Sequence, residues 1–157
     1  MMAAPITSSV LPADFRWGAL VPELVVTSFT ESLDFWCRLL GFEIVYTRPA
    51  HRFAYLRNGA AQVMLEEVTD DSWIAGPLDR PFGRGMNLQI EIADHDAVLD
   101  RLAGENWPLY LAPEEAWYEA GDIEVGLLQF FVRDPDGYLV RLQKPLGTRA
   151  SNGAVFG

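Results

Sequence analysis

The sequence contains the same order of structural signals twice. A strand, a helix and three further strands are indicated between about residues 20 and 68, and the same order is indicated again between about residues 86 and 145. Each half predicts a four-stranded sheet with a helix on one face, which leaves the other face of the sheet uncovered. The repeat therefore predicts an α+β fold in which two βαβββ modules, with mixed and mainly antiparallel sheets, enclose a cavity.

The first half carries clear local signals. The apolar, β-branched run PELVVT predicts a strand. Ser28 and Glu31 match a capping box, so a helix of about three turns is expected to start there and to end at Gly41. FEIVYT, HRFAYLR and AQVMLEE predict three more strands, with a tight hairpin turn at Asn58-Gly59.

The second half repeats these signals. Asp94 is expected to cap a helix that ends near Gly104, and His95, directly after the cap, is expected to face solvent. The DPDG sequence at residues 134–137 predicts a turn equivalent to the one at Asn58-Gly59. Four strands are expected, at residues 86–92, 107–111, 125–132 and 138–143.

The segments outside the repeat differ in composition from it. Residues 1–18 lack periodicity and residues 147–157 are rich in Gly and Ala, so we expect an N-terminal extension and a flexible tail around one domain at 19–146. A linker rich in Gly, Pro and Asp, at 69–85, joins the two modules. It lets the halves pair within one chain or between two chains, and the open face of each half favours a homodimer.

Charge and composition narrow the choice of partners. The chain has 157 residues, and its 12 basic and 22 acidic residues give a formal net charge of −10. This charge repels nucleic acid and attracts cationic ligands. No apolar run approaches the roughly 20 residues that span a bilayer, no signal peptide is indicated, and the only cysteine, Cys37, is expected to be buried and inert. We therefore expect a cytoplasmic protein that binds neither nucleic acid nor membranes.

Three stretches of the sequence resemble a known family. PELVVTSFTESLDFWCRLLGFEIVY, FAYLRNGAAQVMLEE and FFVRDPDGYLVRL are similar to the glyoxalase/bleomycin resistance protein/dioxygenase superfamily, also called the vicinal oxygen chelate superfamily. The similarity covers about residues 20–145. FWCRLLGFEIVY and DPDGYLVRL are most similar to bleomycin resistance proteins, which implies a small-molecule binding cavity and a role in antibiotic resistance.

The resemblance also implies where a metal would be bound. Enzymes of the superfamily hold a divalent metal with side chains at the start of the first strand and on the last strand of each half. By the spacing of the pattern, these positions carry Val21, Met64, Asn87 and Arg141 in this chain. Hydrocarbon, thioether, amide and guanidinium groups do not form a site for a hard metal ion. We therefore expect no metal, no cofactor and no catalytic residue.

Aromatic residues supply the expected ligand site. In bleomycin resistance proteins, aromatic side chains on the corresponding strands sandwich the flat part of the drug, and acidic side chains attract its positive end. This resemblance places Tyr46 and Phe53 at ligand-contacting positions. Val125 stands where resistance proteins often carry Trp, and Trp117 or Tyr118, on the loop before that strand, is the candidate replacement. The predicted ligand-binding residues are Tyr46, Phe53, Tyr55, Trp117, Tyr118, Phe130 and Arg141.

These observations predict a metal-free protein that sequesters a planar or cationic small molecule in an aromatic groove. The alternative is a divalent-metal-dependent lyase, dioxygenase or thiol transferase of the same superfamily. It requires an alignment shift that brings Glu23 or Glu66 inward, or ligation by His51. A regulatory or antitoxin-like module with a vestigial cavity is a third hypothesis.

Overall fold

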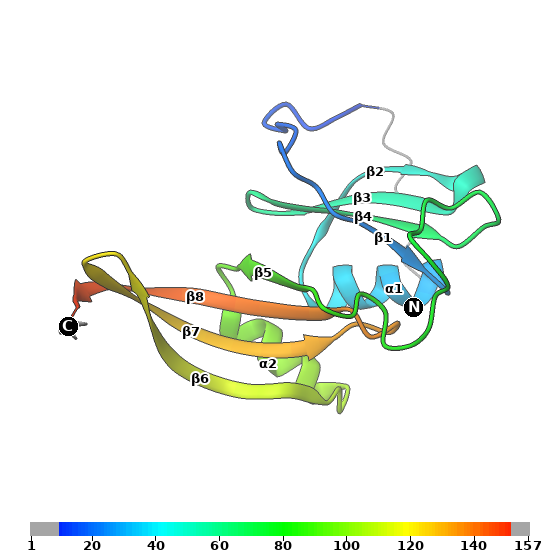
Figure 1. The fold of residues 1–157 in the computed structure, drawn as a ribbon. Coiled ribbons are helices and arrows are strands. Elements are labelled where there is room, and N and C mark those ends of the chain that lie inside the picture. The colour runs from blue at the N-terminus through cyan, green and yellow to red at the C-terminus, as the bar shows by residue number, and fades with distance from the viewer. Residues whose placement is uncertain (1–9, 152–157) are drawn as a thin grey trace. The chain divides into compact units, whose positions relative to one another are not determined.

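The protein contains two compact units in the computed structural model, which describes residues 10–151. The first unit comprises the chain up to Arg84 together with Asp134–Tyr138, and the second comprises Gly85–Arg133 together with the chain from Leu139 onward. Each unit has one four-stranded sheet and one helical region (Figure 1). The α+β architecture with two βαβββ modules is therefore confirmed. Within the described residues, no helix is long and apolar enough to cross a membrane.

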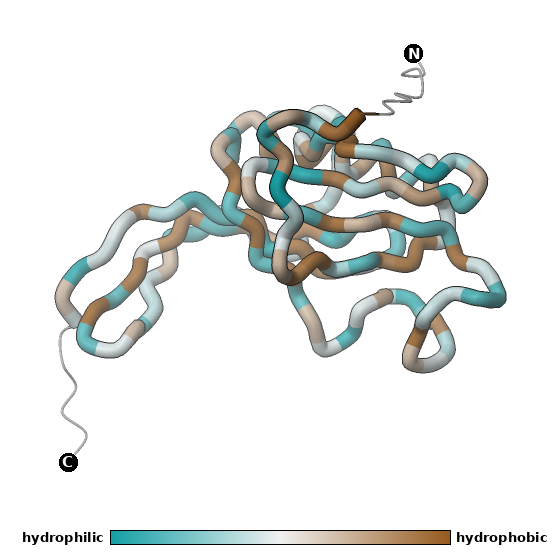
Figure 2. The backbone as a smooth tube through the Cα atoms, turned by 90° about the horizontal axis from the view of Figure 1, so that it is seen from above, coloured by the Kyte–Doolittle hydropathy of each residue, from teal (hydrophilic) through white to brown (hydrophobic). Residues whose placement is uncertain are grey.

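The first sheet has the strand order β1-β4-β3-β2. β1 (Glu23–Val26) runs parallel to β4 (Ala61–Glu67), whereas β3 (Phe53–Asn58) is antiparallel to both β4 and β2 (Glu43–Arg48). Asn58 pairs with Ala61, so the hairpin turn lies one residue later than the sequence predicts. The backbone coloured by hydropathy shows hydrophobic and hydrophilic residues mixed along the chain (Figure 2), and the strands of this sheet contain short apolar runs such as LVV in β1 and VML in β4.

The helix of the first unit begins as predicted. The Ser28 hydroxyl accepts a hydrogen bond from the Glu31 amide at 3.3 Å, and Gly41 adopts a φ of 82° after the helix. The sequence did not predict that α1 (Phe29–Asp34) continues as a π-helical segment, Phe35–Leu39. Within this segment, burial raises the pKa of the Cys37 thiol to about 12, as expected for an inert cysteine. A short 3₁₀ turn, Pro49–His51, precedes β3.

The second sheet has the strand order β5-β8-β7-β6, with β5 parallel to β8. β6 and β7 are longer than predicted and form an antiparallel hairpin with β8, which itself continues beyond the predicted module end at 145. Residues 147–150 are therefore strand and not flexible tail, because they pair with β7. The strands are β5 (Asn87–Glu91), β6 (Leu109–Ala120), β7 (Ile123–Arg133) and β8 (Leu139–Ala150).

Two expectations for α2 (His95–Gly104) are wrong. His95 does not face solvent, because its ring packs edge-on against Phe130 with a centroid distance of 5.0 Å and the side chain is buried. Asp94 precedes the helix but makes no capping hydrogen bond, because its carboxylate pairs with Arg101 at 3.2 Å.

The predicted DPDG turn belongs to the first unit. The buried Asp134 carboxylate accepts hydrogen bonds from the amides of Asp136 and Tyr138, at 3.0 and 2.9 Å, and from Nε1 of Trp36 at 3.3 Å. Gly137 has a φ of 96°, and a Cβ there would lie 2.7 Å from Cα of Pro81. Burial raises the pKa of Asp134 to about 6.

The second half of the predicted linker at 69–85 also packs against the first unit. Arg80 pairs with the buried Asp136 at 3.0 Å, and the Phe82 ring packs edge-on against Tyr138 at 5.8 Å. These contacts explain why the boundary between the units follows Arg84.

Candidate functional site

The first sheet carries α1 on one side, against β4, and we call the opposite side the first-sheet face. Strand register places two rows of side chains on this face, since alternate residues of a strand point to the same side. One row is Glu23, Met64, Tyr55 and Tyr46, and the other is Val25, Glu66, Phe53 and Arg48.

Three of the predicted ligand-binding residues meet on the first-sheet face. The Tyr46 ring stacks on Tyr55 at a centroid distance of 5.3 Å and lies 5.8 Å from Phe53. Phe53 and Tyr55 are buried, and the Arg48 guanidinium lies 3.7 Å from the centre of the Phe53 ring. Tyr46 is half-buried. Phe53 and Tyr55 therefore support the surface, while Tyr46 offers part of its ring to a ligand.

Part of the predicted N-terminal extension lies on this face. Phe15 is only 7 % exposed and packs edge-on against Tyr55 at 5.7 Å. Trp17 lies 5.4 Å from Tyr55 and 6.1 Å from Tyr46, yet it remains 61 % exposed. The expectation that residues 1–18 lie outside the core is therefore wrong at Phe15, whereas Trp17 covers the first-sheet face but stays exposed; residues 1–9 fall outside the described residues.

Gln62 fixes this segment to the sheet. Its Oε1 accepts hydrogen bonds from the Tyr55 hydroxyl at 2.6 Å and from the Gly18 amide at 2.7 Å, and its Nε2 donates to the Arg16 carbonyl at 2.6 Å. An ion pair between Asp14 and Arg57, at 3.2 Å, adds a second attachment. Gln62 and Trp17 are thus site residues that sequence reasoning missed, and no local pattern identifies either of them.

Two carboxyl groups lie beside the aromatic cluster. Glu23 on β1 and Glu66 on β4 share the first-sheet face, and their side chains are hydrogen-bonded to each other. Burial raises the pKa of Glu23, the hydrogen bond with Glu66 and the repulsion by its charge raise it further, and Arg48 opposes the shift. A cation that approaches the two carboxyl groups would relieve this repulsion.

The donors on the described residues do not fit the divalent metal of the superfamily's enzymes. Val21 and Met64 pack against the aromatic cluster, and Asn87 is an exposed amide at the start of β5. Arg141 donates a hydrogen bond to Gln89. Across residues 10–151, no three His, Cys, Asp or Glu side chains gather in a group that could hold a metal ion. Glu23 and Glu66 alone supply too few ligands.

The predicted residues of the second sheet are spread over both of its faces. Phe130 is fully buried against His95 of α2, so it packs in the core of the second unit. Trp117 and Tyr118 are neighbours in β6 and not in a loop, and they therefore point to opposite sides. Tyr118 accepts a hydrogen bond from Gln129 at 2.6 Å.

Trp117 occupies the space above Gly126, the glycine that follows Val125. The two residues are register partners, and a Cβ at Gly126 would lie 2.7 Å from the Trp117 ring. The other contacts of the Trp117 indole are the Arg149 guanidinium, 4.1 Å from the ring centre, and Glu115, which accepts from Nε1 at 2.7 Å. The ring thus lies next to this glycine but is engaged in packing within its own unit.

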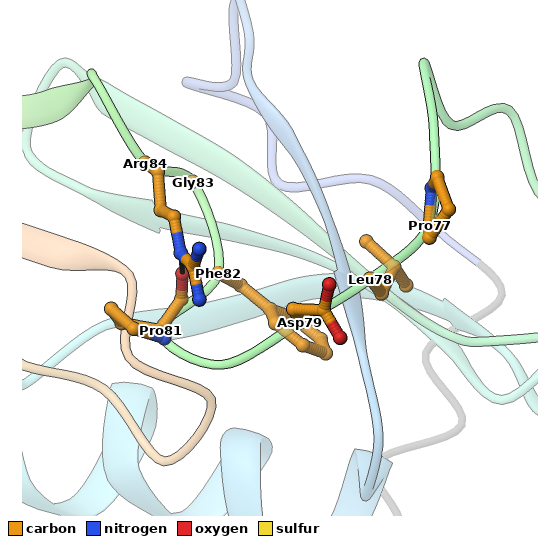
Figure 3. Close-up of a pocket in the computed structure, with 7 residues that line it drawn as sticks. All are labelled: Pro77, Leu78, Asp79, Pro81, Phe82, Gly83 and Arg84. Carbon is orange, nitrogen blue, oxygen red and sulfur yellow. Dashed lines mark hydrogen bonds between the residues drawn. The ribbon is translucent and has the colours of Figure 1, made fainter.

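A surface pocket of about 170 Å³ lies in the loop before β5 (Figure 3). The Arg84 guanidinium folds back onto the same loop, donating to the carbonyls of Arg80 and Pro81 at 2.6 and 3.3 Å. These hydrogen bonds hold the guanidinium within its own loop. We therefore interpret the pocket as a consequence of how the loop folds and not as a ligand site. It is lined by Pro77, Leu78, Asp79, Pro81, Phe82, Gly83 and Arg84.

The chain was compared with curated proteins, with solved structures and with models of protein families. A search of curated proteins gives no match. A glyoxalase/bleomycin resistance protein/dioxygenase superfamily member from Vibrio splendidus 12B01 is 32 % identical, with 79 % of this chain and 95 % of that chain covered and a TM-score of 0.35. TioX from Micromonospora sp. ML1 is 22 % identical, with 83 % and 100 % covered and a TM-score of 0.63.

The genomically encoded fosfomycin resistance protein FosX from Listeria monocytogenes is 16 % identical, with 82 % of this chain and 91 % of that chain covered and a TM-score of 0.53. Similarity at this level of identity shows a shared fold. The model of the family described as glyoxalase/bleomycin resistance protein/dioxygenase superfamily matches residues 19–142, most of the chain. The chain therefore belongs to the glyoxalase/bleomycin resistance protein/dioxygenase superfamily.

Proposed function

We propose that this protein binds a small molecule with a flat ring and a positive charge on the first-sheet face, and sequesters it without chemical turnover. The observation that carries the proposal is the arrangement of two aromatic rings and a carboxyl pair on one face of the sheet. Trp17 and Tyr46 present aromatic surface, and Glu66 and Glu23 lie two and three strands from Tyr46 on the same face. Aromatic rings attract both flat rings and cations, and carboxylates attract cations.

The overall charge supports a cationic ligand. A formal net charge of −10 raises the local concentration of cations and speeds their association. At physiological ionic strength such attraction is screened beyond about 8 Å, so the affinity should fall when salt is added.

Capture without turnover is supported by the side chains around the site. The Cys37 thiol, with its pKa raised to about 12, is no nucleophile at neutral pH. The donors described above do not fit a divalent metal. A metal-dependent enzyme is the second candidate, and the shared face of Glu23 and Glu66 is the observation that favours it. Resistance to an antibiotic by sequestration is one role that such binding would serve. Assembly as a homodimer and a cytoplasmic location stay predictions.

The proposal is tested by calorimetric titration with two flat probes. 9-Aminoacridine is a cation at neutral pH, whereas acridine has the same ring system and is mainly neutral. We expect 9-aminoacridine to bind more tightly, and its affinity to weaken when the pH falls from neutral, because the raised pKa of Glu23 makes this carboxylate lose its negative charge on acidification.

Two tryptophan variants locate the site. Trp17→Leu should weaken binding of 9-aminoacridine by about tenfold, since loss of an aromatic contact with a cation costs about 1 to 2 kcal/mol. Trp73→Leu is the matched control, because Trp73 is 95 % exposed and lies in the loop after β4, not in the segment that packs on Tyr46 and Tyr55. Equal affinity for the two probes, or equal effects of the two variants, would reject the first-sheet face as the site.

A further inference from the structure

Three polar side chains and one phenylalanine form a patch in the second unit. Strand register pairs Gln129 of β7 with Gln143 of β8, and Phe131 with Arg141 in the adjacent row. The neighbouring residues, Phe130 and Leu142, are fully buried, and the Phe130 ring packs against α2. Alternation along the strands therefore places the four residues on the side away from α2, which we call the second-sheet face.

This patch contains buried polar atoms without partners. Gln129 is 1 % exposed and Gln143 is 6 % exposed. Oε1 of each, and Nε of Arg141, are shielded from solvent and make no hydrogen bond. Among the described residues, five buried side-chain atoms lack a hydrogen-bond partner, and three of these five belong to the patch. Buried polar groups in folded proteins nearly always have partners, so this concentration requires an explanation.

The neighbouring contacts show which atoms are available. Nε2 of Gln129 donates to the Glu114 carboxylate at 3.1 Å and to the Tyr118 hydroxyl at 2.6 Å. A carboxylate accepts hydrogen bonds and does not donate them, so this contact fixes the orientation of the Gln129 amide. Its oxygen is therefore the atom without a partner. Arg141 uses one terminal nitrogen to donate to Gln89, and its Nε–H has no partner.

The available atoms are two acceptors and one donor. The complementary group has two N–H donors and one acceptor oxygen, as a primary carboxamide has. We propose that the second-sheet face binds the primary carboxamide group of a small molecule. The ligand NH₂ donates to Oε1 of Gln129 and Gln143, and the ligand carbonyl accepts from Nε of Arg141.

Other polar groups fit this patch less well. A carboxylate brings its negative charge towards two acceptor oxygens and has no hydrogen to donate to them. An ammonium group satisfies both oxygens but is repelled by the Arg141 guanidinium and leaves its Nε–H unpaired. An aromatic ring on the carboxamide finds Phe131, half-buried in the same patch, and Tyr110, whose ring lies 6.3 Å from Phe131 and is exposed. An aromatic carboxamide is therefore the preferred ligand class.

Three related probes test the carboxamide site in the whole protein by NMR titration. Benzamide carries the proposed group, acetophenone replaces its NH₂ by a methyl group, and benzoate replaces it by a charged oxygen. We expect benzamide to shift the side-chain amide signals of Gln129 and Gln143 and to bind about tenfold more tightly than either analogue, as expected when hydrogen bonds to buried acceptors are lost. Benzamide binding no tighter than acetophenone would overturn the proposal.

Gln143→Met separates binding from a structural role. Methionine has nearly the same length but removes the unpaired oxygen, so the variant should lose benzamide affinity by about tenfold while its thermal midpoint stays equal or rises. Lys144→Met is the control. Lys144 is exposed, and because it follows Gln143 directly in β8, its side chain points to the opposite side of the strand. A lower midpoint with unchanged benzamide affinity would assign Gln143 a structural role and reject the site. Binding of 9-aminoacridine reports on the first-sheet face, so failure of either proposal is distinguishable from failure of the other.

Discussion

Replacing Phe53 by alanine is expected to lower the free energy of unfolding by about 3 to 5 kcal/mol, the usual cost of removing a buried aromatic side chain. Phe53 is fully buried and contacts both the Tyr46 ring and the Arg48 guanidinium. The sequence placed Phe53 at a ligand-contacting position, where its loss would mainly weaken ligand binding. In the structure no part of the Phe53 ring reaches solvent, so we expect the substitution to lower the stability of the fold.

Denaturant unfolding followed by tryptophan fluorescence measures this change. Trp73→Ala removes a large aromatic residue that is 95 % exposed, and it should change the unfolding free energy by no more than about 0.5 kcal/mol. If Phe53→Ala were as mild as Trp73→Ala, the packing described for the first-sheet face would be wrong.

The unfolding free energy should also depend on the protonation of Asp134. Burial raises the pKa of this carboxyl from its ordinary value of 3.8 to about 6, so the folded protein holds the proton more tightly than the unfolded chain does. The resulting stabilisation is fully present below pH 3.8 and is lost as the pH rises through about 6. A shift of this size corresponds to at most about 3 kcal/mol.

Comparing wild type with Asp134→Asn across this pH range isolates the effect from other carboxyl groups. Asparagine keeps an oxygen for the amides of Asp136 and Tyr138 but does not titrate. The variant should lack the fall in stability near pH 6, whereas Asp70→Asn, at an exposed loop position, should retain it. A fall of the same size in all three proteins would show that Asp134 is not its source.

The elements that the sequence predicts correctly are those with local signals. The capping box at Ser28, the positive φ at Gly41 and the hairpin after Asn58 depend on residues a few positions apart, and each lies within one residue of its expected place. The strand and helix order of both modules follows from the same kind of pattern.

The features that the sequence did not predict depend on distant contacts. Phe15 and Trp17 have no periodic neighbours, and their place follows from the Tyr55 ring and the Gln62 amide, about forty positions further along the chain. Phe130 was assigned to the ligand site as one of several aromatic residues. Its side of β7 is set by alternation and by contact with α2.

The extra length of β6 and β8 has a similar origin. Residues 112–120 contain Pro113 and several charged residues, a composition that indicates a loop. These residues nevertheless form a strand, because they pair with β7 as far as Ala120. Trp117 and Tyr118 then alternate across a strand, so the two residues lie on opposite faces.

Elemental analysis combined with titration tests metal-free capture most directly. The protein is purified without chelator, its divalent metal content per chain is measured, and 9-aminoacridine is titrated before and after treatment with EDTA. We predict far less than one ion per chain and the same affinity in both titrations, because among the described residues no third His, Cys, Asp or Glu side chain joins the two carboxyl groups of the first-sheet face in a metal-binding group. One bound Zn, Ni, Mn or Fe per chain, with binding lost on its removal, would contradict the account.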